Sequence, residues 1–425
     1  MSVHKLHGAA AAEYDLVLVG AGLVGAALAL ALAPLSLRIA LVEAQPLEQM
    51  DQPGYDERST ALSFASVRIL ESLGLWGMLA DHASPIRYIH VSQQGGFGVS
   101  RFDARDAGVD ALGQVVPNHR LIAALLDRLP RQPGLTLHTP ARLIAVSQDS
   151  ERMRVRLDGP EGPMDLSSRL LVAADGAESP VRTLLGVGVT RRDYGQSAII
   201  ANVTPGLPHG GRAFERFTPE GPVALLPLGE RCALVWTVPS RAQEWALGLP
   251  EGRFLDELEA RFGRRLGRFQ RVGRRQAYPL CLVRARRMVE GRAVLLGNAA
   301  HAIHPVAGLG FNLALREAAI LAEVLTQGHD PGDRDVLERF EQRVQPYQDR
   351  LIAFSDRLPR LFGQRFPGFS HARSLGLLGL DLLPGAKTGF VLHAMGLDGD
   401  MPVLARQTGP GRGWESADDP CHRAL

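Results

Sequence analysis

Three glycine-containing segments are the strongest candidates for a binding or catalytic site in this sequence. They are residues 20–25 (GAGLVG), the pair Asp175-Gly176, and residues 297–312 (GNAAHAIHPVAGLGFN). Each follows an apolar run typical of a buried strand, and the first and third lead into an alanine-rich run typical of a helix. Backbone N–H groups at such a turn, together with the positive end of the helix, can bind an anion. The segments therefore indicate binding through backbone rather than a metal cluster or a Ser-His-Asp triad.

The first segment satisfies the dinucleotide fingerprint. Gly20 permits the tight turn, Gly22 lets a pyrophosphate approach the backbone, and Gly25 lets the helix pack closely on the strand. The flanking strand and helix are expected over residues 14–19 and 25–33. By itself, this motif does not separate FAD from NAD.

A second strand is expected over residues 37–43, and it ends in Glu43. The first strand, the helix and this strand make a βαβ unit of about 30 residues. A carboxylate at the end of the second strand can accept hydrogen bonds from ribose hydroxyls. Glu43 is therefore a candidate for contact with the ribose of the dinucleotide.

Composition narrows the class of protein. The chain has 425 residues, 45% of them hydrophobic, and a formal charge of +2, which indicates a globular protein with room for two domains and no nucleic-acid partner. The arginine-rich residues 261–275 are interpreted as a solvated helix face and loop. The three cysteines, Cys232, Cys281 and Cys421, form no metal or disulfide pattern and favour a reducing compartment. The apolar residues 16–35 are interpreted as a buried strand and helix, not as a membrane span.

The three segments, in this order, resemble the single-component FAD-dependent aromatic hydroxylases of the para-hydroxybenzoate hydroxylase type. Further segments are similar to the ubiquinone-biosynthesis branch of that family, with the hydroxylases of 2-octaprenyl-6-methoxyphenol as the most similar group. These segments are residues 56–63 (DERSTALS), 112–118 (LGQVVPN), 211–218 (GRAFERFT), 221–228 (GPVALLPL) and 277–280 (AYPL). The resemblance covers roughly residues 15–400.

The resemblance implies roles for individual residues. The pyrophosphate would lie at the first motif, the adenosine ribose at Glu43 and the adenine side of FAD at Asp175. The flavin ring and its ribityl chain would lie along residues 297–312. The cofactor-binding residues implied are Gly20, Gly22, Gly25, Glu43, Arg58, Gln114, Asp175, Gly176, Asn298, Gly308, Phe311 and Asn312.

Two positions in the third segment depart from the general family pattern. Asn298 stands where most of the family has Asp beside the ribityl chain, which removes a negative charge near the flavin. His304 precedes Pro305, where the prototype has a second proline. The resemblance puts the Pro305 carbonyl on the reaction side of the flavin, and a histidine beside it could titrate near neutral pH. The other interpretation is that His301 and His304 only hydrogen-bond loop backbone.

In this family, NAD(P)H reduces FAD, and reduced flavin reacts with O₂ to a C4a-hydroperoxide that oxygenates a phenol. The resemblance therefore implies FAD, NAD(P)H and O₂, and a polyprenylated phenol such as 2-polyprenyl-6-methoxyphenol as substrate. The sequence contains one fingerprint in the required context, which favours transient contact of the nicotinamide over a second Rossmann domain. His304 and Pro305 are the candidate catalytic residues, the flavin carries the chemistry, and the sequence assigns no catalytic base.

The predicted fold is α/β with mixed α+β character: a Rossmann-like FAD-binding domain, an inserted antiparallel-sheet substrate domain and a C-terminal helical region. Short alternating segments between residues 197 and 236 carry the prediction of the inserted sheet. The predicted spans are a flexible tail (1–13), the discontinuous FAD-binding domain (14–190 and 285–345), the substrate domain (191–284), C-terminal helices (346–400) and a disordered tail (401–425).

The inserted sheet is expected to cover the substrate. Phe214, Phe217, Leu226 and Trp236 are candidates for an apolar wall, with ordinary sheet core as the alternative. A prenyl tail needs an apolar exit, which residues 375–383 and 389–395 could offer. We expect a cytoplasmic protein with peripheral contact at the inner face of the membrane or with other quinone-biosynthesis proteins; burial against the helical core is the alternative.

Two other functions stay open at this stage. One is hydroxylation of a small soluble aromatic compound. The other is a non-catalytic flavoprotein subunit of a biosynthetic complex.

Overall fold

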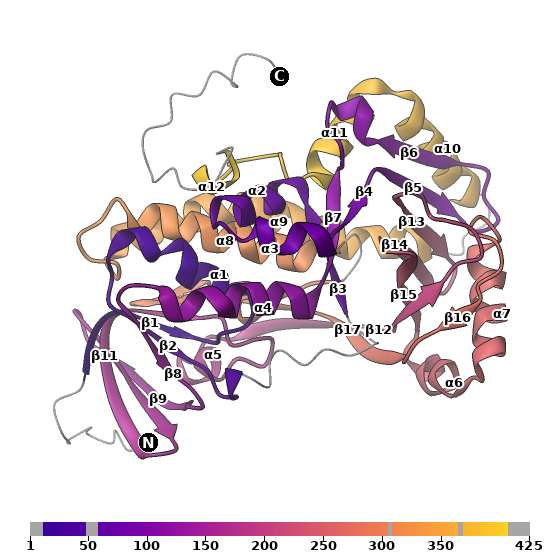
Figure 1. Cartoon of the computed structure of the whole chain (residues 1–425). Coiled ribbons are helices and arrows are strands. Elements are labelled where there is room, and N and C mark those ends of the chain that lie inside the picture. The colour runs from indigo at the N-terminus through magenta and orange to yellow at the C-terminus, as the bar shows by residue number, and fades with distance from the viewer. Residues whose placement is uncertain (1–11, 48–57, 305–307, 364–368, 407–425) are drawn as a thin grey trace.

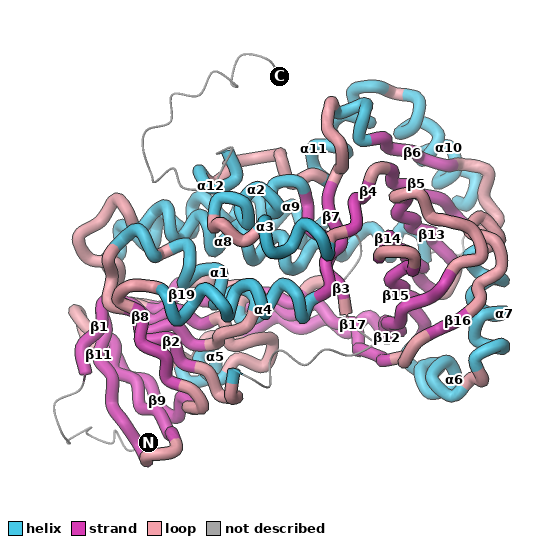
Figure 2. Tube along the Cα trace, viewed as in Figure 1, coloured by secondary structure: helices cyan, strands magenta, loops and turns pink. Residues whose placement is uncertain are grey.

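A computed structural model describes residues 12–47, 58–304, 308–363 and 369–406. Its described elements form two lobes, each built on one sheet (Figure 1). Figure 2 shows helices gathered on the first lobe and strands of a second sheet in the other lobe, and most of the strand pairs in that second sheet are antiparallel. Helix α9 runs along the first lobe toward the second.

The first sheet contains the strands that lead into all three glycine segments. Its central order is β18-β19-β11-β1-β2-β8, and β10 and β9 extend it beside β11. Strands β1, β2, β8, β11 and β19 pair in parallel, so their carboxyl ends meet at one edge, where ligands bind in open α/β sheets. The bounds are β1 Ala12–Val19, β2 Ile39–Val42, β8 Leu135–His138, β9 Arg142–Gln148, β10 Met153–Gly159, β11 Gly162–Ala173, β18 Val289–Glu290 and β19 Ala293–Leu295.

Helices pack on this sheet because their apolar faces need cover. Helix α1, Leu23–Ala31, is apolar throughout and buried from Gly25 onward, which confirms that the apolar run belongs to the core. The other helices of this lobe are α2 Phe64–Ser72, α3 Trp76–Leu79, α4 Asn118–Arg128, α5 Pro180–Leu184, α8 Leu309–Leu325, α9 Arg334–Gly363 and α12 Val403–Arg406.

The second sheet has the order β20-β17-β12-β15-β14-β13-β5-β6, with β16 beside β12. Its outer face packs on α6 and α7 through a core that includes Trp236, Phe254 and Phe262. The bounds are β5 Tyr88–Gln93, β6 Val99–Asp103, β12 Val189–Thr204, β13 Arg212–Thr218, β14 Gly221–Leu228, β15 Arg231–Pro239, β16 Arg271–Val272, β17 Gln276–Ala285, β20 His301–Ala302, α6 Gln243–Gly248 and α7 Glu251–Phe262.

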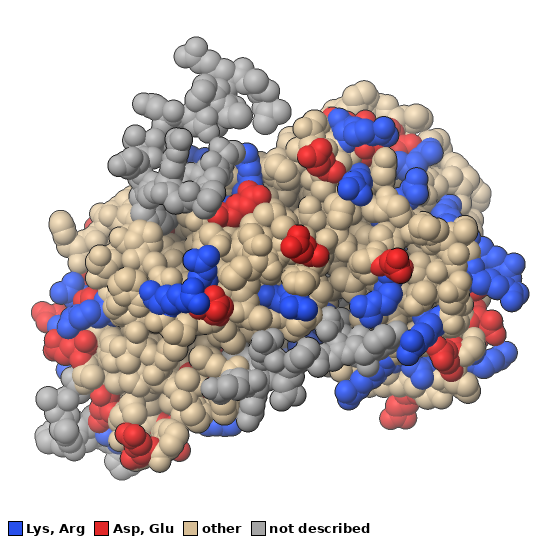
Figure 3. Space-filling view, viewed as in Figure 1, with Lys and Arg blue, Asp and Glu red and all other residues tan. Residues whose placement is uncertain are grey.

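A three-stranded sheet and two further helices close the space between the lobes. Strands β3 Ser59–Ser63, β7 Gly113–Pro117 and β4 Ser84–Ile86 form the small sheet. Helices α10 Phe369–Leu382 and α11 Pro384–Ala394 cover the end of the second sheet that holds β5 and β6 (Figure 1). Acidic and basic side chains occur over both lobes on the face shown in Figure 3.

The structure differs from the predicted spans at several places. Strand β1 begins at Ala12, inside the predicted tail, because it pairs with β11 from that residue onward. Strands β5 and β6 join the second sheet although residues 88–103 fall within the predicted FAD-binding span; β5 pairs in parallel with the distant β13. Residues 401–406, predicted as disordered, include α12, whose Ala405 is buried. Residues 407–425, and Cys421 with them, lie outside the described residues.

Candidate active site

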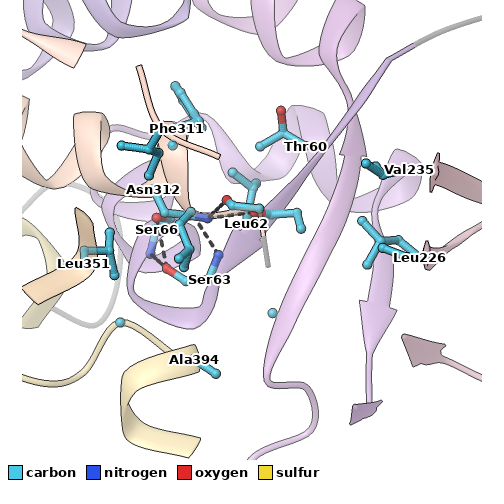
Figure 4. A pocket seen from close by; sticks show the side chains of 18 of the residues that line it. Thr60, Leu62, Ser63, Ser66, Leu226, Val235, Phe311, Asn312, Leu351 and Ala394 are labelled. Carbon is cyan, nitrogen blue, oxygen red and sulfur yellow. Dashed lines mark hydrogen bonds between the residues drawn. The ribbon is translucent and has the colours of Figure 1, made fainter. Parts of the chain in front are cut away.

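A cavity of about 780 Å³ lies between the two lobes. The turns after β1 and β11, the 3₁₀ turn Gly297–Ala299, the start of α8 and strand β3 line one part of it. The inner face of the second sheet and helices α9, α10 and α11 line the rest. In Figure 4, Phe311 and Asn312 lie across the cavity from Leu226 and Val235.

The three glycines of the first motif differ in what surrounds them. Gly20 has φ +101°, and a Cβ there would lie 2.5 Å from the Ala174 carbonyl oxygen. A Cβ on Gly25 would lie 1.8 Å from the Gly20 carbonyl oxygen, whereas one on Gly22 would meet nothing within 4 Å. Gly20 and Gly25 are therefore needed for packing, and Gly22 lines the cavity with its surface open. This is the arrangement that a pyrophosphate requires.

The Glu43 carboxylate is hydrogen-bonded to the backbone of the glycine motif. Its Oε2 accepts a hydrogen bond from the Ala21 N–H at 2.8 Å, and its Oε1 accepts one from the Gln45 N–H at 2.9 Å. Each carboxylate oxygen has a second lone pair. The carboxylate is thus held in place with capacity left for ribose hydroxyls.

Asp175 follows β11, between the cavity-lining Ala174 and Gly176. Its Oδ2 accepts a hydrogen bond from the Val181 N–H at 3.1 Å. Its Oδ1 is buried and makes no hydrogen bond within the described part of the chain. Burial raises the pKa of this carboxyl. A buried acceptor without a donor fits a cofactor that supplies one.

Arg58 and Gln114 occupy different positions relative to the cavity. Arg58 lines it, with its guanidinium 5.5 Å from the centroid of the Tyr278 ring. Gln114 lies on β7 opposite Leu62 and Pro85, beside the lining residue Gly113 and not on the wall itself. Only Arg58 of these two side chains therefore faces the space that a cofactor could fill.

The third segment presents both backbone and side chains. Asn298 is exposed and lines the cavity, as do Gly308, Phe311 and Asn312. The Asn312 Nδ2 donates to the carbonyls of Ala61 (2.8 Å) and Gly308 (2.7 Å), and its Oδ1 accepts from the Ser63 N–H (2.8 Å). The Asn312 amide therefore fastens β3 to the start of α8. The contacts of all these residues with FAD remain predictions.

Both histidines of this segment are buried. His301 Nε2 contacts both oxygens of the buried Glu317, at 2.8 and 2.9 Å. His304 is 1% exposed, and burial lowers its pKa to about 4. The prediction that His304 titrates near neutral pH is therefore wrong, because desolvation keeps the ring uncharged. Pro305 lies outside the described residues.

The four candidate substrate residues divide between the two faces of the second sheet. Phe217 and Leu226 lie on the inner face and line the cavity. The Trp236 ring packs on the outer face against Phe254, with a centroid separation of 5.2 Å, and is fully buried. The Phe214 ring packs against Phe262 at 5.4 Å in the same outer core, although Phe214 also borders the cavity. Trp236 is therefore sheet core and not substrate wall.

Glu215, the carboxyl of the described cavity wall, is not among the predicted site residues. Glu215 lies on β13 between Ala213 and Phe217, and all three line the cavity. The alternation along β13 could have identified Glu215 as a wall residue, because residues two apart in a strand share a face. A carboxylate at an inward position of an otherwise apolar alternation is unusual and deserves a functional explanation.

Comparison with known proteins agrees with this geometry. The FAD binding domain family matches residues 13–355. The chain is 39% identical to the ubiquinone hydroxylase UbiL of Rhodospirillum rubrum, covering 92% of this chain and 91% of that protein. It is 32% identical to 3-demethoxyubiquinol 3-hydroxylase of Escherichia coli K12, covering 90% and 98%.

Solved structures share the fold. The p-nitrophenol 4-monooxygenase PnpA of Pseudomonas putida DLL-E4 superimposes with a TM-score of 0.73 at 18% identity, covering 92% of this chain and 99% of that one. The FAD-binding fold with an added sheet domain is thereby confirmed. The chain belongs to the FAD-dependent aromatic monooxygenases of the FAD binding domain family, in the branch of the ubiquinone-biosynthesis hydroxylases.

Proposed function

We propose that this protein hydroxylates the ring of a polyprenylated phenol, 2-polyprenyl-6-methoxyphenol, in ubiquinone biosynthesis. The observation that carries the proposal is the extent of the apolar cavity wall. From the start of α8, the lining continues to side chains of α9, α10 and α11 that a small phenol would not need. These side chains include Leu358, Leu377, Leu380 and Phe390. The names of the relatives, which are ubiquinone hydroxylases, support the same substrate class.

The residues of the chain divide the work between binding and water exclusion. Bound FAD, reduced by NAD(P)H, supplies the activation of O₂. The turns at Gly22 and Asp175 would hold its dinucleotide part, and the Gly308–Asn312 segment would border its ring. The apolar inner face of the second sheet excludes water from the reacting atoms, which protects against loss of the oxidant as hydrogen peroxide.

Turnover with matched phenols tests the substrate class. We expect FAD-loaded enzyme to convert 2-geranyl-6-methoxyphenol with a kcat/KM at least about 100-fold above that for 2-methoxyphenol, because burial of the tail is favourable by roughly 0.8 kcal/mol per CH₂ before binding costs. Equal values for both phenols would favour a hydroxylase of small soluble aromatics. Bound FAD with no substrate-stimulated NAD(P)H oxidation would favour a non-catalytic subunit.

Quinone profiling in a deletion strain tests the biological role. The strain should accumulate the prenylated 6-methoxyphenol and lose ubiquinone, and a plasmid copy of the gene should reverse both changes. An unchanged quinone pool would contradict the proposal.

We also propose that α10 and α11 contact a membrane surface where the tail enters, as a peripheral contact at the inner face. Three leucines at these helices are largely exposed, Leu375 (59%), Leu382 (67%) and Leu383 (60%). Among the described helices, none is by itself long and apolar enough to span a bilayer; the pair His371–Leu382 and Pro384–Ala394, bent by 89°, meets the criteria of length and composition together.

Liposome co-sedimentation tests this contact. The double variant Leu382→Ser/Leu383→Ser should bind phospholipid vesicles more weakly than the wild type while keeping its activity on detergent-dispersed substrate. The variant Leu184→Ser, at an exposed leucine on the first lobe, is the matched control. Equal sedimentation of all three proteins would remove the membrane contact.

A further inference from the structure

Glu215 is the only carboxyl among the described residues that line the cavity. Its strand neighbours on the same face are Ala213 and Phe217, and the residues paired with it are Ala224 on β14 and Val91 on β5. All four also line the cavity and are apolar. The carboxyl therefore stands alone on an apolar wall.

The other charged or ionisable groups of the described wall have partners. The Arg58 guanidinium lies over the Tyr278 ring. Arg316 donates to the carbonyls of Gly396 and Asp398 and lies over the Tyr347 ring. His393 Nδ1 is 3.1 Å from the Asp398 carboxylate. Each of these groups is held by the protein itself.

For the Glu215 carboxyl, the described part of the chain contains no hydrogen-bond or ion-pair partner. An interior carboxylate without a partner is costly, and the residues paired with Glu215 on the neighbouring strands, Ala224 and Val91, offer no polar side chain. The partner that this geometry lacks is a hydrogen-bond donor inside the cavity.

Position along β13 relates this carboxyl to both ends of the cavity. Ala213 lies in an apolar cluster with Ala61, and Ala61 adjoins Gly308 at the start of α8, since a Cβ on Gly308 would lie 3.0 Å from the Ala61 Cβ. In the other direction, Phe217 clusters with Leu377 of α10. Glu215 lies about 7 Å from each of its two strand neighbours. A phenol ring near α8 with its tail toward α10 would therefore pass Glu215.

We propose that Glu215 is a catalytic residue that accepts the proton of the substrate's phenolic hydroxyl. The phenol O–H bond breaks and its electron pair stays on the phenol oxygen, while a new O–H bond forms on the carboxylate. The resulting phenolate carries more electron density at its ortho and para carbons, which are the carbons that attack electrophilic oxygen. This inference rests on the proposed function, since it needs a phenol as the substrate.

The electrostatics of the site suit this role. Burial among apolar side chains raises the pKa of Glu215 to about 7. The carboxyl is then partly ionised at neutral pH, and its pKa is closer to that of a phenol, about 10, than an ordinary carboxyl would be.

Neighbouring strands add no titrating group at this face near neutral pH. On β5, Tyr88 and His90 alternate with the cavity-lining Val91 and so point to the other face, and β14 contains no titratable residue. Helix α9 brings Tyr347 to the wall, and burial raises the pKa of that phenol. His393 of α11 also lines the cavity, where it is paired with the Asp398 carboxylate, so only an inflection that Glu215→Gln removes from the pH profile is assigned to Glu215.

Three variants separate the proposed role from a structural one. Glu215→Gln keeps the size of the side chain and removes the proton acceptor, and Glu215→Asp keeps a carboxyl. Glu230→Gln, at an exposed position on the turn between β14 and β15, is the matched control. FAD content and melting temperature establish that each holoenzyme is folded.

Product formation from 2-geranyl-6-methoxyphenol is the first readout. Loss of a general base lowers rates by roughly 10²- to 10⁴-fold, and we expect a fall in this range for Glu215→Gln, partial recovery for Glu215→Asp and no change for Glu230→Gln. The wild-type profile should rise with pH through about 7, and this inflection should be absent from Glu215→Gln. Turnover of Glu215→Gln within threefold of the wild type, with the inflection retained, would overturn the proposal.

Two readouts without turnover separate this inference from the proposed function. Difference absorbance of the same phenol bound to oxidised holoenzyme should show ionisation at a lower pH than in free solution, and Glu215→Gln should abolish that shift. Infrared difference spectra of the ligand-free holoenzyme should show a carboxylic acid that deprotonates near pH 7 and whose signal is absent from Glu215→Gln; identical spectra of the wild type and Glu215→Gln between pH 5 and pH 9 would overturn the inference. Bound phenol that ionises but is never hydroxylated would contradict the proposed function and leave Glu215 supported.

Discussion

At the scale of single residues, Gly22 and Gly25 stand three positions apart in one turn and serve different ends. A side chain on Gly25 would collide with the Gly20 carbonyl, whereas one on Gly22 would enter open space. The backbone of Gly22, with φ −64° and ψ −176°, is open to any residue. The fold therefore does not require glycine at position 22. We attribute the glycine to the close approach of a ligand in the cavity.

We predict that Gly22→Ala weakens FAD binding at least about tenfold while the melting temperature of the apoprotein stays within about 2 °C. Gly25→Ala should lower both, because the strand and helix must separate. FAD titration by flavin fluorescence and thermal unfolding of the apoprotein check these outcomes. Unchanged FAD affinity in Gly22→Ala would place the pyrophosphate elsewhere.

Glu215 also predicts a pH dependence of stability. Its pKa is raised in the folded protein to about 7 from 4.5, so its contribution is fully present below pH 4.5 and is lost as pH rises through 7. The free energy of unfolding of the wild type, relative to Glu215→Gln, should therefore fall by about 2 to 3 kcal/mol between pH 5 and pH 8. Denaturant unfolding at equal FAD saturation measures the difference. A constant difference would contradict the raised pKa.

At the scale of elements, helix α8 is held by two sets of side-chain contacts. Asn312 fastens it to β3 through three hydrogen bonds. Farther along α8, Glu317 contacts His301 and also accepts from Gln348 Nε2 of α9 at 2.9 Å. Together these contacts hold the loop that carries Asn298 and the turn at Gly308. Asn312 lines the cavity, whereas Glu317 is not among its lining residues.

Asn312→Ala should lower the free energy of unfolding by roughly 2 to 4 kcal/mol, since it removes three partly buried hydrogen bonds worth about 1 kcal/mol each. It should also weaken FAD binding, because β3 and the start of α8, which both line the cavity, are no longer held in fixed positions relative to each other. Urea unfolding and FAD titration measure the two effects. If stability alone changes, the position of β3 is set by other contacts.

Glu317→Ala should lower the free energy of unfolding by about 3 kcal/mol or more, because His301 and Gln348 lose a buried partner. The matched control is Glu338→Ala, which breaks the exposed pair with Arg334 and should change stability by less than about 1 kcal/mol. Both values come from denaturant unfolding. An equal decrease in the free energy of unfolding of the two variants would show that the buried Glu317 contacts stabilise the fold no more than an exposed ion pair.

At the scale of the whole molecule, the cavity exists only because the two lobes and the C-terminal helices meet. Its far end is formed by Leu358 of α9 and Leu377 of α10, which cluster with Phe217 of the second sheet. Leu377 is buried, whereas Leu375, two residues earlier on the same helix, is 59% exposed. This pair allows the proposed tail path to be blocked or left open.

We predict that Leu377→Trp lowers kcat/KM for 2-geranyl-6-methoxyphenol at least about tenfold and leaves kcat/KM for 2-methoxyphenol within twofold, because the larger side chain fills only the distal part of the cavity. Leu375→Trp should leave both values unchanged. Steady-state kinetics of the three proteins measure this. A parallel loss on both phenols would mean that the tail does not extend along α10.

Much of the fold follows from local pattern. The strand, glycine turn and apolar helix at residues 12–31 are readable because backbone geometry there requires glycine and because burial on both faces requires a continuous apolar run. The inserted sheet is readable from short alternating segments. The pairing of β5 with β13 is not readable, because contacts between distant segments leave no local signature.

The orientation of side chains in the second sheet is likewise only partly predictable from the sequence. Alternation along β13 and β15 separates Phe217 from Phe214 and Val235 from Trp236, yet it cannot say which face looks into the cavity. That choice depends on α7 covering one face and on the first lobe facing the other.

The nucleotide-binding turn, the alternation of elements and the family can be read from the amino-acid sequence, because these depend on residue types at fixed local spacing. The folded structure is needed to see that His304 is buried and uncharged at neutral pH, that Asn312 binds backbone and that Glu215 has no partner among the described residues on the cavity wall. Burial and partnership are properties of segments brought together from far apart in the chain, and they set the pKa values and orientations on which the chemistry depends.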